Sequence, residues 1–300
     1  MSIILKELGY TPYIIGTHLL NFDISFINQT TNLVIIKNNF SEIKKTDYDV
    51  LIVNSDQTWR RFDKHFYDYG FLKFAENWKI KKIVYGASLG FDKWNLTSED
   101  EKIAKKLVKK FSAVSVREKG SIKLIKQHFG IIPEIVLDPT LLIKSKYYFD
   151  IIKDYKHDIF INKKYIFIYS VHKSKNLEDT LEKARLMFKF EIYYYNLKII
   201  NTIQDFIYYI ANCNAVLTNS FHGTIFSIIF NKPFLTIYDS SNAKERFNWV
   251  RDLFGVNDRL VENEQKPDIY QLLKPLNINK NLLNKFKLQS INFLKKNLKN

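Results

Sequence analysis

Short apolar runs alternate with amphipathic stretches along the whole chain. In the first half the runs are rich in β-branched and aromatic residues, which is typical of strands buried on both faces of a parallel sheet. Residues 98–111 and 121–129 carry apolar positions at helical spacing, and this order of elements predicts an α/β fold. The predicted strands cover 13–15, 33–36, 50–53, 83–85 and 113–116.

The alternation resumes in the second half. Residues 144–164 are charged and show no clear sheet pattern, so we place the domain link there. We predict two Rossmann-like domains with parallel sheets, over 1–145 and 160–275, that face a ligand cleft. The elements predicted beyond the link are strands over 165–171, 191–195, 215–218 and 234–238 and helices over 177–189, 203–211, 222–230 and 243–254.

A basic amphipathic helix closes the chain. Within residues 276–300 the pattern predicts a helix over 282–298, with Leu283, Phe286 and Leu294 among its apolar positions. In most soluble chains such a face packs on a core. The alternative is peripheral contact with an anionic membrane, at its cytoplasmic face.

Composition excludes several classes of protein. The 300 residues include nine Gly and six Pro, too few for a collagen-like or low-complexity chain. The single cysteine, Cys213, excludes a disulfide framework and fits a reducing compartment. No apolar run is long enough to cross a bilayer, and Lys6 and Glu7 interrupt the first one. We therefore expect a cytoplasmic protein.

The charge of the chain needs a separate interpretation. A net charge of +15 is high enough to attract nucleic acid, an anionic membrane or an acidic substrate. Only seven of the 46 basic residues are arginines, and no arginine-rich tract occurs. We interpret the charge as a lysine-coated surface and expect no nucleic-acid partner.

Motifs for common cofactors and metals are absent from the sequence. There is no GxGxxG or GxxxxGK[ST] loop for a nucleotide, and the six histidines show no paired metal spacing. Asp47 and Asp49 mimic a metal-binding DxD motif, but they precede a strand, so turn chemistry explains them better. We expect no metal site.

The strongest local signal lies in residues 215–233. An apolar strand ends, Asn219, Ser220, His222 and Gly223 follow, and an apolar helix begins. A strand end that meets a helix N-terminus attracts anions, and glycine lets a ligand approach the backbone closely. The alternative is structural: Asn219 or Ser220 caps the helix, and His222 is buried.

Polar or small residues also follow three predicted strands of the first half. Side chains at such strand ends point toward a cleft. Ordinary turns are the alternative for the polar residues, and pairing with a carboxylate is the alternative for an arginine. The residues concerned are Asp56 and Gln57 after 50–53, Ser88 after 83–85 and Arg117 after 113–116. Two further arginines of the second half, Arg246 and Arg259, bracket the helix that ends at Gly255.

Taken together, these segments resemble the polysaccharide pyruvyl transferase family. They occur in the family's order and span about residues 48–260. The matching segments are NSDQTW (54–59), YGASLG (85–90), SVRE (115–118), VLDPTLL (136–142) and AVLTNSFHGTIFSIIFNKPF (215–234), followed by Arg246 to Arg259.

The resemblance implies a GT-B-like fold whose second domain binds the donor. It implies transfer of the enolpyruvyl unit of phosphoenolpyruvate to a sugar or lipid-linked saccharide, usually as a ketal, in capsular or exopolysaccharide synthesis, without a metal or organic cofactor. His222 is the implied general acid or base, and Asp56 is the second one or orients the sugar. The implied substrate-binding residues are Arg117, Ser220, Asn219, Gly223, Arg246, Gln57 and Ser88.

The chain departs from the family at three places. Ser220 stands where some members have an arginine, and Asn54 stands where many have glycine. The usual first strand and its glycine-rich loop have no counterpart, so we expect either a start upstream of Met1 or a truncated copy. The alternatives to a pyruvyl transferase are another GT-B-like glycosyltransferase and a truncated, non-catalytic homologue.

Overall fold

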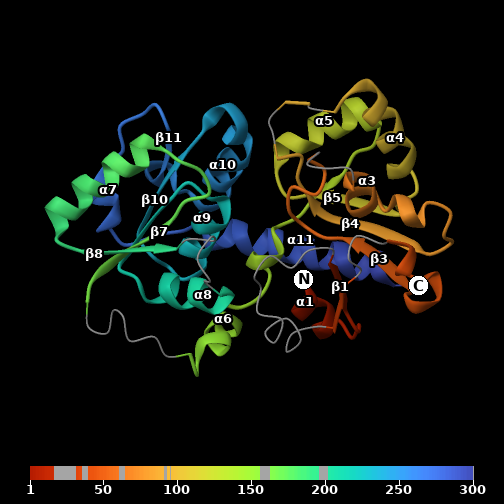
Figure 1. Cartoon of the computed structure of the whole chain (residues 1–300), viewed down its shortest axis with the longest axis horizontal. Coiled ribbons are helices and arrows are strands. Elements are labelled where there is room, and N and C mark those ends of the chain that lie inside the picture. Colours follow the sequence, from red (N-terminus) through yellow and green to blue (C-terminus); the bar gives the residue numbers. More distant parts are fainter. Residues whose placement is uncertain are drawn as a thin grey trace. The chain divides into compact units, whose positions relative to one another are not determined.

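The chain folds into two compact units, each built on its own parallel sheet (Figure 1). The first unit contains most residues up to Leu142 together with Leu283–Asn300, and the second is formed mainly by Ile143–Leu282. The structure is a computed structural model, and it describes residues 1–16, 32–35, 40–60, 65–90, 93–94, 96–155, 163–195 and 202–299.

The first unit has a four-stranded parallel sheet with the strand order β3-β4-β5-β6. Because all four strands run in the same direction, their carboxyl ends lie along one edge. The strands are β3 (Val50–Val53), β4 (Lys81–Ala87), β5 (Ala113–Val116) and β6 (Glu134–Ile135). A separate parallel pair, β1 (Tyr13–Gly16) and β2 (Asn32–Ile35), follows helix α1 (Ser2–Glu7).

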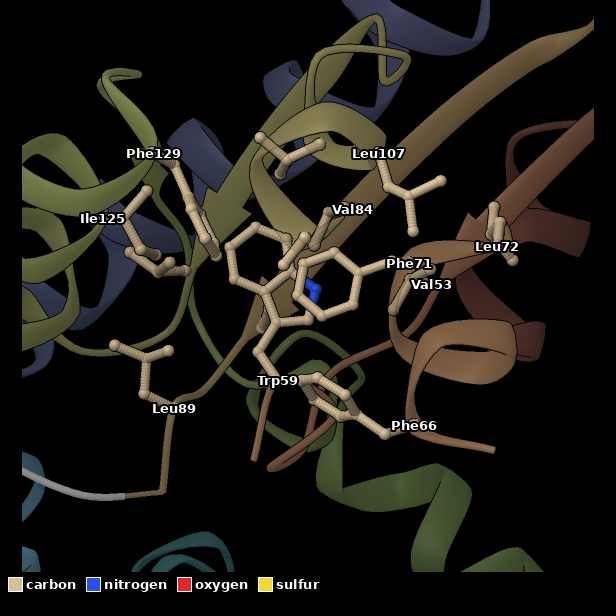
Figure 2. Packing of buried hydrophobic residues seen from close by; sticks show 14 of the residues in the cluster. Val53, Trp59, Phe66, Phe71, Leu72, Val84, Leu89, Leu107, Ile125 and Phe129 are labelled. Atoms are coloured by element: carbon tan, nitrogen blue, oxygen red, sulfur yellow. The ribbon is translucent and has the colours of Figure 1, made fainter. Parts of the chain in front are cut away.

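Three helices and an aromatic cluster cover one face of this sheet. Trp59 lies fully buried at the centre of the cluster, stacked on Phe71 with 5.2 Å between ring centroids and edge-on to Phe129 (Figure 2). Its indole N–H donates to the carbonyl of Gly70 at 2.7 Å, so its polar atom is satisfied. The helices are α3 (Phe66–Phe71), α4 (Ser98–Val108) and α5 (Lys119–Phe129).

The last helix, α11 (Lys280–Leu298), packs on the opposite face of the same sheet. Val84 faces the aromatic cluster, and its neighbour Tyr85 points the other way, with its ring 6.1 Å from that of Phe293. The hydroxyl of Ser290 accepts the amide of Leu137 at 2.8 Å. The predicted packing of this helix on a core is therefore confirmed. None of the helices in the described part of the chain combines the length and apolarity of a membrane crossing.

The second unit has a five-stranded parallel sheet with the order β11-β10-β9-β7-β8. Helix α7 packs on one face through Leu177, Leu181 and Ala184, while Phe206 of α8 packs between Phe167 of β7 and Phe226 of α9. The strands are β7 (Tyr165–Tyr169), β8 (Glu191–Tyr195), β9 (Ala215–Thr218), β10 (Phe234–Tyr238) and β11 (Leu260–Glu262). The helices are α6 (Ser145–Ile152), α7 (Lys175–Phe188), α8 (Ile203–Asn212), α9 (Phe221–Ile229) and α10 (Ser240–Phe254).

The structure corrects the prediction for residues 144–164. Residues 145–152, which the prediction placed in the domain link, form α6, and the ring of Tyr148 packs on Phe226 with 5.1 Å between centroids. This segment belongs to the second unit. Two parts of the predicted segments, residue 36 and residues 156–162, lie outside the described residues.

Candidate functional site

The carboxyl edge of the first sheet carries four of the predicted site residues. Asp56 and Gln57 follow β3, Ser88 follows β4, and Arg117 is the first residue after β5. Asp138, three residues after β6, joins them at the same edge. The parallel strands thus bring together residues that are far apart in the sequence.

Arg117 is the centre of this edge. Its side chain is 1% exposed, and its Nη1 and Nη2 atoms donate to Asp138 Oδ2 at 2.8 Å and to Asp56 Oδ1 at 3.0 Å. Its Nε lies 3.7 Å from Glu118 Oε2. Burial alone would lower the pKa of Arg117, but the carboxylates of Asp138, Glu118 and Asp56 outweigh it and raise the pKa above its ordinary value. The guanidinium is therefore a permanent cation enclosed by carboxylates.

Asp56 combines an exposed side chain with an unusual backbone. Its φ angle is 134°, a conformation that side chains other than glycine rarely adopt. Its carbonyl accepts the amide of Ser88 at 2.9 Å, while its carboxylate is 61% exposed. Residues held in rare backbone conformations cluster at functional sites. Asp56 is thus both fixed and accessible.

Gln57 and Ser88 serve the turns in which they lie. Gln57 Oε1 accepts from Arg60 Nη1 at 2.9 Å, and Ser88 Oγ accepts the amide of Gly90 at 3.0 Å. The carbonyl of Ser88 accepts the amide of Trp59 at 3.3 Å. The two side chains therefore bond within their turns, and the backbone of Ser88 links the turn after β4 to Trp59 of the aromatic cluster.

The carboxyl edge of the second sheet carries Asn219, Ser220, His222 and Gly223, all of which follow β9. Ser220 is the N-cap of α9, and its hydroxyl accepts the amide of Gly223 at 3.4 Å. Asn219 accepts the amide of Val171 at 2.8 Å. Its Nδ2 donates to Ser170 Oγ at 2.9 Å and to the carbonyl of His172 at 2.7 Å. Ser220 therefore caps the helix, as the structural alternative predicts, whereas Asn219 bonds to the turn after β7.

Gly223 is required by packing inside the unit. A Cβ atom at this position would lie 2.3 Å from Thr218 Oγ1, well inside contact distance. The close approach that a glycine allows here is thus made by the last residue of β9. The first turn of α9 sits directly on that strand end.

His222 is presented differently from every residue around it. From Ala215 to Ile228, a stretch that the structure describes completely, His222 is the one residue that is not buried. The structural alternative, a buried histidine, is therefore wrong. The strand and helix on either side are fixed by their burial, so the imidazole is held on a rigid support at the edge of the sheet.

The two arginines that bracket α10 have different surroundings. Arg259 is buried and donates to four backbone carbonyls, which makes it a structural residue; these belong to Phe234, Gln271, Lys274 and Pro275, at 2.7–3.4 Å. Arg246 lies on α10, partly exposed, with its guanidinium 5.8 Å from the ring centroid of Phe221. Arg246 is thus beside Phe221, the first residue of α9, which precedes His222 in the sequence.

The part that Asp138 plays at the first edge was not predicted from the sequence. Asp138 follows a short apolar run, so the rule that singled out Asp56 and Arg117 could have found it. Ser55, whose hydroxyl donates to Asp138 Oδ2 at 3.3 Å, could have been found in the same way. Within the described ranges, no group of three or more His, Cys, Asp or Glu side chains is arranged to hold a metal ion.

Comparison with known families decides the identity of the chain. The model of the family described as polysaccharide pyruvyl transferase matches residues 3–241, which is most of the sequence. The chain belongs to the polysaccharide pyruvyl transferase family. Both edges described above lie within the matched residues, whereas Arg246 and Arg259 lie beyond them. No curated protein matches the chain.

Solved structures show that this family member has a GT-B-like fold. A UDP-GlcNAc 2-epimerase from Methanocaldococcus jannaschii superposes with a TM-score of 0.62 at 14% identity, covering 98% of this chain and 95% of that one. A UDP-GlcNAc 2-epimerase from Neisseria meningitidis, bound to UDP-GlcNAc, gives 0.59 at 14% identity, with 99% and 95% covered. The predicted fold class is confirmed, and at this identity the likeness concerns the fold alone.

Proposed function

We propose that this protein transfers the pyruvyl group of phosphoenolpyruvate to a pair of sugar hydroxyls during capsular or exopolysaccharide synthesis. Family membership supports the transferase class. The observation that carries the proposal is His222, which is partly exposed while every other residue from Ala215 to Ile228 is buried. A titratable side chain on a rigid support at the carboxyl end of a parallel strand is suited to proton transfer.

The chemistry of the transfer requires two proton movements. The methylene carbon of the donor gains a proton and becomes a methyl group, while a sugar hydroxyl loses its proton and bonds to the adjacent carbon. The bond from that carbon to the phosphate oxygen then breaks, and the second hydroxyl bonds to the same carbon. One hydroxyl proton balances the new methyl hydrogen, and the other leaves with phosphate. One acid and one base suffice for this sequence.

We assign the acid and base roles to His222 and Asp56. The imidazole of His222 donates or accepts the proton of the donor carbon, and the exposed carboxylate of Asp56 accepts a proton from the sugar hydroxyl or orients it. The donor carries a carboxylate and a phosphate, so we place it at the N-terminus of α9, which favours negative charge, with Arg246 as a nearby cation. Asn219, Ser220 and Gly223 shape this end of the helix.

The remaining partners follow from the same proposal. The acceptor is a free or lipid-linked saccharide, and the reaction needs no metal or organic cofactor. We place it in the cytoplasm, where the single thiol of Cys213 stays reduced.

The test measures phosphate release from phosphoenolpyruvate with and without a pool of free and lipid-linked saccharides. We expect release that depends on the acceptor, and we expect His222→Ala to lower kcat by about 10²–10⁴-fold, the usual contribution of a general acid or base. His65→Ala, which removes another partly exposed histidine, is the matched control and should retain activity.

Two other outcomes would replace the proposal. Transfer from a nucleotide-sugar, without phosphate release from phosphoenolpyruvate, would indicate another GT-B-like glycosyltransferase. A folded protein without activity toward either donor would indicate a non-catalytic homologue.

A further inference from the structure

The geometry around Arg117 does not suit a direct ligand of the donor. All three guanidinium nitrogens face carboxylates of the protein, at 2.8 Å (Asp138), 3.0 Å (Asp56) and 3.7 Å (Glu118). The side chain is 1% exposed, so a substrate anion would have to displace a carboxylate that is already in place. Arg117 therefore acts on its neighbours and not on the substrate.

Asp138 fixes the Arg117 guanidinium by accepting a hydrogen bond from its Nη1 atom. Its Oδ2 atom accepts from Arg117 and from Ser55 Oγ, and its Oδ1 atom accepts from the amide and hydroxyl of Thr140 at 3.0 Å and 2.7 Å. The Asp138 side chain is 3% exposed. A buried carboxylate with four donors has a single orientation, and Arg117 inherits that orientation through its Nη1 atom.

Asp56 is the point at which this buried network reaches the surface. Its Oδ1 atom is held by Arg117, and its backbone is held by the amide of Ser88. Among the described residues, no hydrogen-bond donor reaches its Oδ2 atom, and the side chain is 61% exposed. The carboxylate is thus anchored through one oxygen and open at the other.

We propose that Arg117 and Asp138 are positioning residues that hold Asp56 in the orientation it needs for the reaction. The proposal rests on the proposed function, in which Asp56 acts on the sugar hydroxyl. It replaces the direct donor contact that the family resemblance implies for Arg117. The positioning role also explains the rare φ angle of Asp56. Arg117 and Ser88 together stabilise the backbone conformation that directs the Asp56 side chain outward.

The kinetic test compares Arg117→Lys, Asp138→Asn and Asp56→Asn with the wild type. Loss of a residue that supports a metal ligand typically costs about 10–100-fold in activity, and we take this range for a residue that supports a catalytic carboxylate. We expect losses of that size in kcat for Arg117→Lys and Asp138→Asn, with KM for phosphoenolpyruvate changed by less than about twofold. A rise in KM with unchanged kcat would overturn the proposal, since it would indicate a donor ligand. Arg185→Lys, at the exposed pair with Glu182, is the matched control.

A double-mutant cycle separates positioning from general damage. If Arg117 acts only through Asp56, then Arg117→Lys in the Asp56→Asn background lowers kcat no further than Asp56→Asn alone, within about twofold. Multiplicative losses in the double variant would contradict this route. Asp138→Asn provides the same comparison if Arg117→Lys does not fold.

A third readout needs no turnover. Hydrogen–deuterium exchange of the folded Arg117→Lys and Asp138→Asn proteins should speed up at the Ser88 amide and in residues 54–58, and remain unchanged in the second unit. Unchanged exchange at Ser88 would overturn the positioning proposal, whatever the kinetics show. Absence of phosphate release from the wild type, together with faster exchange in the variants, would count against the proposed function alone.

Discussion

The two sheets end in edges of opposite chemistry. The first edge is held by ions: a buried guanidinium is bound by carboxylates that follow β3, β5 and β6. The second edge is held by neutral groups, namely the amide of Asn219 and the hydroxyls of Thr218 and Ser220. Removing one charge from an ionic edge leaves its partner buried and unpaired, so the loss of stability is large. Removing one polar group from a neutral edge costs only the hydrogen bonds of that group. Asp56 is nevertheless exposed at the first edge, and His222 is partly exposed at the second.

Arg117→Ala should have the largest effect on stability. The substitution leaves Asp138 and Glu118 buried without their cation, and breaking a buried ion pair costs about 3–5 kcal/mol. Urea unfolding should show this loss. Arg185→Ala, at an exposed pair, should cost less than about 1 kcal/mol. Equal losses in the two variants would mean that the first edge is not ionic in solution.

Gly223→Ala is the sharpest test of the second edge. The added Cβ would meet Thr218 Oγ1 at 2.3 Å, and overpacking of this kind costs about 1–3 kcal/mol. The same unfolding assay applies. In a Thr218→Ala background, which removes the opposing hydroxyl, Gly223→Ala should cost less than it does in the wild type. An equal cost in both backgrounds would place the strain elsewhere.

Asn219→Ala should loosen the turn that follows β7. It removes the bonds to Ser170, Val171 and His172, and we expect a loss of about 1–2 kcal/mol, because the turn is partly hydrated. Trypsin should cut faster after the exposed Lys173. Asn219→Asp keeps the acceptor for the Val171 amide, so its stability and its rate of cutting should lie between those of the wild type and of Asn219→Ala. An unchanged cutting rate would show that the turn holds without Asn219.

The smallest effect concerns alkaline pH in the second unit. Burial raises the pKa of the Cys213 thiol from 9.0 to about 12. Between these values the folded state keeps a proton that the unfolded state loses, so stability falls as pH rises through 9. The loss between pH 8 and pH 10 should be about 1.4 kcal/mol from this group. Urea unfolding at the two pH values should show a loss of stability that is smaller by that amount in Cys213→Ala than in the wild type. Equal losses in the two proteins would assign the effect to other groups.

The sequence alone located most of the buried strands and the carboxyl ends at which the site residues lie. The strands over 50–53, 113–116, 191–195, 215–218 and 234–238 have the bounds that the apolar runs predict. For 215–218 and 234–238, burial on both faces explains this accuracy, because such strands tolerate few polar residues and their ends are marked by the first ones. Asp56, Arg117 and His222 were found by this rule.

The partners of those residues could not be predicted in the same way. Arg117 and Asp138 are 21 residues apart, and nothing local in either segment specifies their bond. The short helix Phe66–Phe71 is mostly aromatic and lacks a helical repeat, and Ser145–Ile152 lies in a charged segment whose packing on Phe226 depends on the distant α9. Bonds and helices that depend on contacts between distant segments cannot be predicted from the local pattern of a single sequence.

The packing of α11 has a consequence for the order in which the protein is made. The helix belongs to the first unit. In the sequence, however, residues 143–282 separate it from the strands of the sheet that it covers. Ser290 bonds to an amide 153 residues earlier in the chain. On the ribosome, the second unit can therefore emerge whole while the first still exposes the face around Tyr85. The unit synthesised first is completed last, once the chain has been made through α11.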